Sequence, residues 1–302
     1  MPNSTYGNRP GFLIFHLLLK IGGLGAAYVL LLIILPYYIL LRPSVFKISD
    51  HYLRRRFPQR GFIARYLTCF KYIYTYGAVL IEQVALGIVG TEGIGVEFPQ
   101  REQFAGLVKK NRGLILLTTH IGPWQNIMAT YDKMHCNVHF HFDTENWQGG
   151  HFFDLNNKKK NFSVISPRNF MGGMIEATNV LLKGQCLCVM GDRISTTDTV
   201  VTPFLGDDAH FPAYPYRLAT ATNSDIVVLL TSRIGPMKYY IEYKCLTDEL
   251  KTSDMPRADA EKYLVRSYAG FIEDFLTKHP YMWYNFSNFW GSPLKDGDSL
   301  RE

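Results

Sequence analysis

The distribution of apolar residues divides the chain into two parts. The N-terminal part is almost continuously apolar, and in the longer part that follows short apolar runs alternate with helical patterns. Residues 21–41 carry no charge, and 21 helical residues are about 31 Å long, which matches the hydrocarbon core of a bilayer. The pattern predicts a membrane-anchoring helix. Pro36 should kink this helix or end it early, so both a spanning and a re-entrant placement stay open.

Charges beside this segment predict its orientation. Arg9 and Lys20 precede it. Basic residues concentrate on the cytoplasmic side of a membrane helix, so the body of the protein should face the cytoplasm. A secretory signal peptide and a buried core helix are the rival interpretations; small residues precede the strongest apolar run, which disfavours the first. The basic residues that follow are Arg42, Lys47, Arg54, Arg55, Arg56 and Arg60.

The rest of the chain predicts an α/β fold. An aromatic-rich helix is expected over 62–89, and helices over 171–183 and 256–279, because apolar residues recur there at helical spacing. Several later runs are continuously apolar, which is typical of strands covered on both faces. We therefore expect a mixed, largely buried β-sheet flanked by helices. The expected strands are 113–118, 137–141, 162–165, 186–190, 225–231 and 239–243.

Composition narrows the possible functions. Hydrophobic residues make up 47% and charged residues 19%, which excludes a disordered chain or a small disulfide scaffold. The net charge of +6 suits an anionic membrane surface or an acidic carrier better than nucleic acid. The five cysteines form an odd set without a CxxC pair, which indicates a reducing compartment and structural roles.

A histidine follows the first strand expected in the body. His120 comes just after the run 113–118 and before a helix that should begin at Pro123. The carboxyl end of such a strand is where α/β sheets place reactive groups, and histidine can act there as a general base. A structural role is the alternative. His139 and His141 should share one strand face, but two ligands make a poor metal site, so no metal is expected.

Four blocks of sequence, in order, resemble a known family. Residues 120–125, HIGPWQ, resemble the HxGNWE motif of the lipid A acyltransferase-like branch of the lysophospholipid acyltransferase superfamily. VMGDRI at 189–194 is similar to its second block. VTPFLGDDAHFPAYPYRLA at 201–219 is similar to the block with an FLG-type turn. PYMWYNFSNFW at 280–290 resembles its aromatic tail, in the variant that ends NFxxFW.

The resemblance implies a membrane-bound acyltransferase that moves a fatty acyl chain from a thioester to a lipid hydroxyl or amine. The donor would be acyl carrier protein or coenzyme A, and the acceptor a glycolipid, aminolipid or related envelope lipid. No bound cofactor, metal or nucleic acid is expected. It also implies the bacterial inner membrane, with the catalytic domain on the cytoplasmic face. Residues 1–60 would be the anchor and basic juxtamembrane segment, 61–292 the acyltransferase domain, and 293–302 a polar tail.

By this resemblance His120 is the catalytic base and Gln125 its partner, at a position where the family has a carboxylate. Glutamine can fix a histidine tautomer but cannot neutralise an imidazolium. Three interpretations stay open: a subfamily adapted to Gln125, a non-catalytic lipid-binding or scaffold protein, or a carboxylate supplied from elsewhere. The candidates for that carboxylate are Asp192, Asp143 and Glu145.

The remaining motif residues are expected to bind substrate or shape its channel. By analogy with the family, Arg193 would hold the donor's phosphopantetheine or an acceptor anion, and a structural pair with Asp192 is the alternative. Asn285 and Trp290 are expected to close the active-site side of the sheet or to belong to the core. Basic residues at 109–112 and 158–160 are candidates for docking acyl carrier protein, or form a solvated face. The expected substrate-binding residues are Gly122, Trp124, Asp192, Arg193, Phe204, Gly206 and Pro212.

Overall fold

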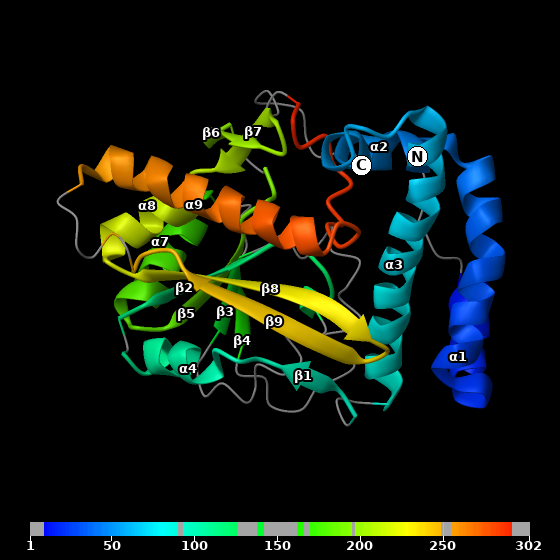
Figure 1. Ribbon diagram of the computed structural model, residues 1–302. Helices are drawn as coiled ribbons and strands as arrows, with labels where there is room; N and C mark the ends of the chain where they lie inside the picture. Colours follow the sequence, from blue (N-terminus) through cyan, green and yellow to red (C-terminus); the bar gives the residue numbers. More distant parts are fainter. Residues whose placement is uncertain are drawn as a thin grey trace.

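The computed structural model describes residues 9–89, 93–110, 112–125, 138–141, 162–165, 170–194, 197–248, 250 and 255–291. Three helices precede a seven-stranded sheet, whose faces are covered by further helices (Figure 1). The expected mixed α/β fold, with a buried sheet and an apolar N-terminal helix, is confirmed. Asp143, Glu145, the basic residues 158–160 and the tail 293–302 lie outside the described residues.

The first three helices are α1 (Arg9–Leu41), α2 (Pro43–Arg56) and α3 (Phe62–Val89). Residues Leu17–Leu41 of α1 are long and apolar enough to cross a membrane. The kink expected at Pro36 lies instead at Gly23, which has φ 63° and ψ −165°. Glycine has no Cβ and tolerates this left-handed conformation, whereas α1 continues past Pro36 to Leu41.

The main sheet has the order β1-β9-β8-β2-β5-β3-β4. Strand β2 pairs in parallel with β5 and β8, and β3 pairs in parallel with β5 and β4. Strand β9 is antiparallel to β8, and β1 is parallel to β9. The strands are β1 (Gly95–Glu97), β2 (Leu114–Thr118), β3 (Val138–His141), β4 (Phe162–Ile165), β5 (Cys186–Met190), β8 (Asp225–Gly235) and β9 (Lys238–Cys245).

Strand β2 shows why the central strands are continuously apolar. Its five residues are all buried, and they alternate between two cores. Ile115 and Leu117 belong to the core under helices α7 (Phe170–Leu182), α8 (Tyr214–Thr222) and α9 (Arg257–Lys278), whereas Leu114 and Leu116 belong to the core beside α4 (Arg101–Lys109). Successive strand side chains point to opposite faces, so a sheet covered on both sides needs apolar residues throughout.

A separate antiparallel hairpin joins β6 (Thr199–Phe204) to β7 (Asp207–Pro212). The tight turn expected from the FLG-type motif is confirmed, because Leu205 and Gly206 have φ of 52° and 87°. Positive φ at both central residues is the signature of a two-residue hairpin turn. The hairpin strands and β1 were not expected from the sequence, since their polar and apolar residues do not form long runs.

Candidate active site

His120 and Asp192 meet at the carboxyl edge of the sheet. Each lies two residues beyond the end of its strand, and β2 and β5 are parallel neighbours with Thr118 opposite Met190. The His120 ring nitrogen Nδ1 is 2.9 Å from Asp192 Oδ1. The His120 backbone N–H donates to the other carboxylate oxygen, Oδ2, at 2.9 Å. One carboxylate therefore fixes both the ring and the backbone of His120.

Asp192 is buried, with 1% of its surface exposed, and two further side chains hold it. The Trp283 indole N–H donates to Oδ2 at 2.8 Å, and the Asn285 amide donates to the Asp192 carbonyl at 2.8 Å. Burial by itself raises the pKa of Asp192. The adjacent His120 ring and the hydrogen bonds from His120 and Trp283 outweigh burial and lower the pKa below its ordinary value. Asp192 is therefore an anion at neutral pH.

This arrangement assigns a tautomer to His120. A carboxylate anion accepts hydrogen bonds, so Nδ1 carries the proton and Nε2 presents its lone pair. The His120 side chain is 27% exposed, whereas Asp192 is enclosed. A histidine held in this way can remove a proton at Nε2, and the carboxylate then stabilises the resulting imidazolium. The geometry is that of a general base with its orienting carboxylate.

A strap formed by residues 280–291, the C-terminal strap, covers this edge of the sheet. Trp283 forms an isolated antiparallel bridge with Ile121. The Tyr284 N–H donates to the His120 carbonyl at 2.7 Å, and the Gly122 N–H donates to the Met282 carbonyl at 2.7 Å. The motif around His120 and the aromatic tail, about 160 residues apart in sequence, are therefore hydrogen-bonded to one another.

Helix α3 holds the strap from its other side. The Tyr72 hydroxyl donates to the Trp283 carbonyl, and the Thr75 hydroxyl donates to the Tyr281 carbonyl at 2.8 Å. Tyr72 is fully buried. The edge of the sheet that carries His120 is therefore connected through the strap to α3.

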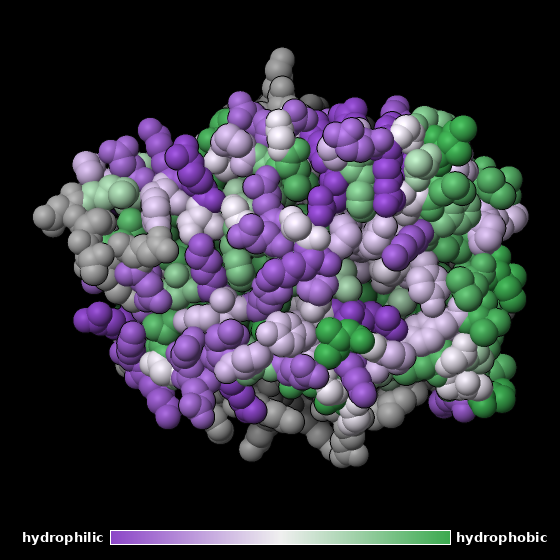
Figure 2. Space-filling model, in the orientation of Figure 1, coloured by the Kyte–Doolittle hydropathy of each residue, from purple (hydrophilic) through white to green (hydrophobic). Residues whose placement is uncertain are grey.

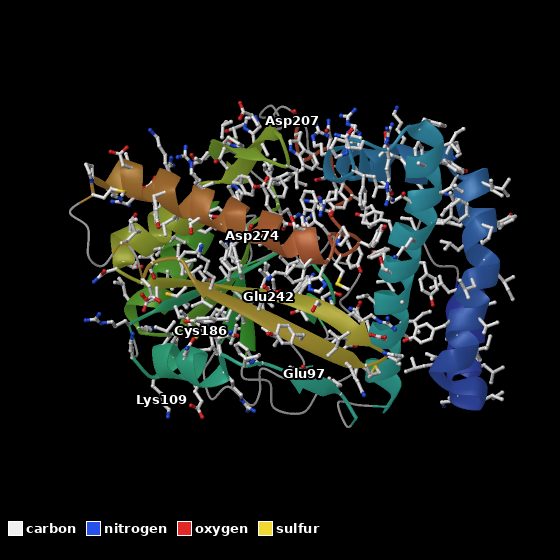
Figure 3. The ribbon with its side chains drawn as sticks, in the orientation of Figure 1. Glu97, Lys109, Cys186, Asp207, Glu242 and Asp274 are labelled. Atoms are coloured by element: carbon white, nitrogen blue, oxygen red, sulfur yellow. The ribbon has the colours of Figure 1, made fainter. Side chains whose placement is uncertain are left out.

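The β6–β7 hairpin packs on the strap. Phe204 has no exposed surface and lies edge-on to Trp283 at 5.3 Å and stacked on Trp290 at 5.8 Å between ring centroids. Pro212 is buried and Gly206 is exposed at the turn. Phe204 is thus part of an aromatic core, and its expected part in shaping an acyl channel stays a prediction. Arg55 of α2 also reaches the hairpin, at 2.7 Å from Asp207, which Figure 3 labels at the hairpin turn.

Gln125 does not hold the ring. Trp124 and Gln125 are both partly buried in the turn after Pro123, and among the described residues no hydrogen bond joins His120 to Gln125. Asp192 takes that position because its strand is the immediate neighbour of β2. The expected pairing of His120 with Gln125 is corrected accordingly. Asp192 was one of the three carboxylates expected as alternatives to Gln125, and it is buried in contact with His120.

Some of the other expected site residues lie beside His120 and Asp192, and others contact different groups. Asn285 lies at the dyad, as expected, and Arg193 is exposed directly after Asp192. Trp283 was missed, although it stands in the aromatic block that the sequence analysis singled out. His139 and His141 contact different hydroxyls, those of Ser163 and Tyr214. Within the described ranges no group of three or more His, Cys, Asp or Glu residues could hold a metal.

Strand β8 lies so close to the segment 120–125 that position 122 has room only for glycine. Its φ is 56°, and an added Cβ would lie 1.8 Å from the Thr231 carbonyl oxygen. Gly122→Ala should therefore destabilise the fold by about 3 kcal/mol, from the left-handed penalty and overpacking together. Thermal unfolding of the purified protein measures this. Gly206→Ala is the matched control, because it has φ 87° but no atom within 4 Å; equal losses in both variants would contradict the proposed clash.

Comparison with known proteins gives one family match. A family model described as bacterial lipid A biosynthesis acyltransferase matches residues 24–292. The match includes His120, Asp192 and the whole C-terminal strap. No curated protein matches the chain.

Proposed function

This chain belongs to the bacterial lipid A biosynthesis acyltransferase family, and from that premise we propose that it acylates an envelope lipid. The donor is a thioester of acyl carrier protein or coenzyme A, used as a co-substrate. The acceptor is a hydroxyl or amine of a glycolipid, aminolipid or related lipid. The proposed location is the bacterial inner membrane, with the catalytic domain on the cytoplasmic face.

The observation that carries this proposal is the 2.9 Å contact between His120 Nδ1 and Asp192 Oδ1. In the proposed reaction His120 Nε2 removes the acceptor's proton as its oxygen or nitrogen attacks the thioester carbonyl. Asp192 stabilises the imidazolium. The tetrahedral intermediate then collapses, the C–S bond breaks, and the thiolate takes the proton from His120. Each turnover thus returns the dyad to its starting protonation state.

Two sets of basic residues support roles in holding the donor, one beside the site and one at the end of α4, before β2 begins. Arg193 is exposed beside Asp192, so its guanidinium is available to an anionic group of either substrate. Lys109 and Lys110 are exposed at the end of α4; Figure 3 shows Lys109 at the surface. We assign these lysines to docking acidic acyl carrier protein through charge complementarity.

The rival function, a non-catalytic lipid-binding or scaffold protein, rests on the missing carboxylate at position 125. Asp192 removes that argument, because it places a buried carboxylate on the ring nitrogen that needs one. Trp283 and Asn285 also donate hydrogen bonds to Asp192, which keep it charged and fixed in place. We therefore favour the enzyme.

Lipid mass spectrometry tests the function. Cells that express the wild type should contain a lipid heavier by one acyl chain, and His120→Ala should abolish it because the general base is lost. Gln125→Ala should retain more than about a tenth of the product, since Asp192 and not Gln125 stabilises the imidazolium. Membrane levels of each variant serve as the control. An undiminished product in His120→Ala at equal protein level would refute the proposal.

A further inference from the structure

One side of the molecule is a largely apolar surface, which we call the apolar flank. It consists of the outward face of α1 and the corner where α3 begins, and Figure 2 shows it as the hydrophobic edge of the molecule over these helices. Ile21 is 80% exposed, Ile63 75% and Ile33 68%. An apolar surface of this extent marks an interaction site. Its large exposed side chains are Ile21, Val29, Leu32, Ile33, Tyr37, Leu40, Phe62, Ile63 and Leu67.

Charge indicates what the flank contacts. Residues 17–89 contain nine lysines and arginines and two acidic residues, Asp50 and Glu82. Both acids are neutralised inside the fold, Asp50 by Arg65 and Glu82 by Arg233, each at 2.7 Å. The three helices thus offer an apolar face with an excess of positive charge. That combination fits an anionic lipid surface.

Helix α1 is docked lengthwise on α3. Ala27, Leu35 and Ile39 of α1 are buried, and the Leu31 side chain lies directly against Gly77 of α3. The Tyr28 hydroxyl donates to Glu82 at 2.6 Å, and Arg233 of β8 donates to the same hydroxyl at 3.1 Å. The outward side of α1 is therefore exposed while its inner side is part of the protein.

Helix α3 in turn is docked on the sheet. Glu82 has no exposed surface and accepts from Arg233 and from the Tyr239 hydroxyl, the latter at 2.8 Å. Helix α3 also holds the strap through Tyr72. From the outer side of the molecule inward, α1 is followed by α3 and then by the sheet, and the three lie side by side (Figure 1).

This layering conflicts with a membrane-spanning α1. If Lys20 and Arg42 marked the two surfaces of a bilayer, Tyr28 would lie about 12 Å below one of them, from eight residues at 1.5 Å each. The contacts of Tyr28 would place Arg233, at the end of β8, at that depth too. The adjoining turn into β9, with exposed Lys238, would then meet hydrocarbon. Charges and open sheet edges are excluded from lipid at this depth.

We propose that the apolar flank lies on one anionic leaflet of a bilayer, with α1 in the plane of the membrane and not across it. The membrane geometry is inferred from the docking, exposure and charge of the first three helices, and it does not depend on the proposed function. Its meaning for catalysis rests on the proposed function: the strap joins His120 to α3, so this placement brings the catalytic edge beside the layer that holds the lipid acceptor.

Tags at both ends of the full chain test the topology. The expected result is that an N-terminal and a C-terminal tag are digested by protease from the same side, in inverted but not in right-side-out membrane vesicles. A spanning α1 places the tags on opposite sides, and that result would overturn the proposal. The readout needs no acyl transfer, so it is independent of the proposed function.

A cross-link tests whether α1 stays docked in the membrane. Leu31→Cys with Gly77→Cys should form a disulfide in native membranes on mild oxidation, because these positions are in contact. Leu32→Cys with Gly77→Cys is the matched control, since Leu32 is 55% exposed on the outward face, and it should cross-link at least about tenfold less. Equal cross-linking of both pairs, or of neither, would overturn the docked arrangement.

Vesicles of two compositions test the lipid charge. The purified chain, diluted from detergent, should bind phosphatidylglycerol vesicles at least about tenfold more tightly than phosphatidylcholine vesicles at low salt, from an expected contribution of about 1 kcal/mol per basic residue at the surface. The difference should shrink as salt is added. Equal binding to both vesicles would overturn the assignment to an anionic leaflet.

Discussion

Replacing Asp192 with asparagine should reduce acyl transfer by about 10⁴-fold, the loss that follows the same change in a comparable His–Asp dyad. Asparagine keeps the shape of the side chain but cannot stabilise the imidazolium, and it can present an N–H where Nδ1 needs an acceptor. Single-turnover transfer from a radiolabelled acyl thioester measures the loss. Because Asp192 is also buried, folded protein must be confirmed by thermal unfolding.

Two variants separate this role from a general loss of structure. Asp207→Asn changes a carboxylate on the hairpin that is 56% exposed and bonded to Arg55, and should leave the transfer rate unchanged. Gln125→Ala should cost much less than Asp192→Asn. If Gln125→Ala abolished transfer while Asp192→Asn retained it, the orienting partner of His120 would be Gln125 and the geometric argument would fail.

Removing Arg233 should produce the second large effect, on stability. In Arg233→Leu, Glu82 stays in a site without exposed surface but loses its cation, and breaking a buried pair in this way costs about 3–5 kcal/mol. The hydroxyls of Tyr28 and Tyr239 still donate to Glu82, so the lower end of that range, about 3 kcal/mol, is expected. Thermal unfolding in detergent is the measurement.

An ion pair with an exposed arginine supplies the control for Arg233. Arg257 lies 3.5 Å from Glu261 and is 57% exposed, so Arg257→Leu should cost less than about 1 kcal/mol. The double change Glu82→Leu with Arg233→Leu should recover part of the loss, because no unpaired charge remains. A loss in Arg233→Leu no larger than in Arg257→Leu would show that the Glu82 cluster contributes little to holding α3 on the sheet.

The sequence predicts most of the sheet but little of its assembly. The six expected strands all form, because their apolar runs are long enough to be recognised without knowing their neighbours. The pairing of β2 with β5 is a long-range property, and it decides that Asp192 and not Gln125 meets His120. The resemblance to the family motif favoured Gln125, which stands five residues after His120, where the family has its carboxylate.

Buried polar residues were the hardest to foresee. In the sequence Glu82 is one of a few charges spread thinly along a long aromatic-rich helix. In the structure it has no exposed surface and joins α1, α3, β8 and β9. Trp283 reads as one aromatic residue among many, yet its indole N–H reaches Asp192. Both roles depend on partners more than 50 residues away in sequence, so no local pattern reports them.

The strap limits when the site can be completed during translation. The groups that fix Asp192 and the His120 backbone come from residues 283–285, and the ribosome releases these after every strand of the sheet. A nascent chain can therefore bury its sheet and bring α1 to the lipid before the dyad is locked. The hydrogen bonds that fix Asp192 therefore cannot be complete before residues 283–285 have been synthesised.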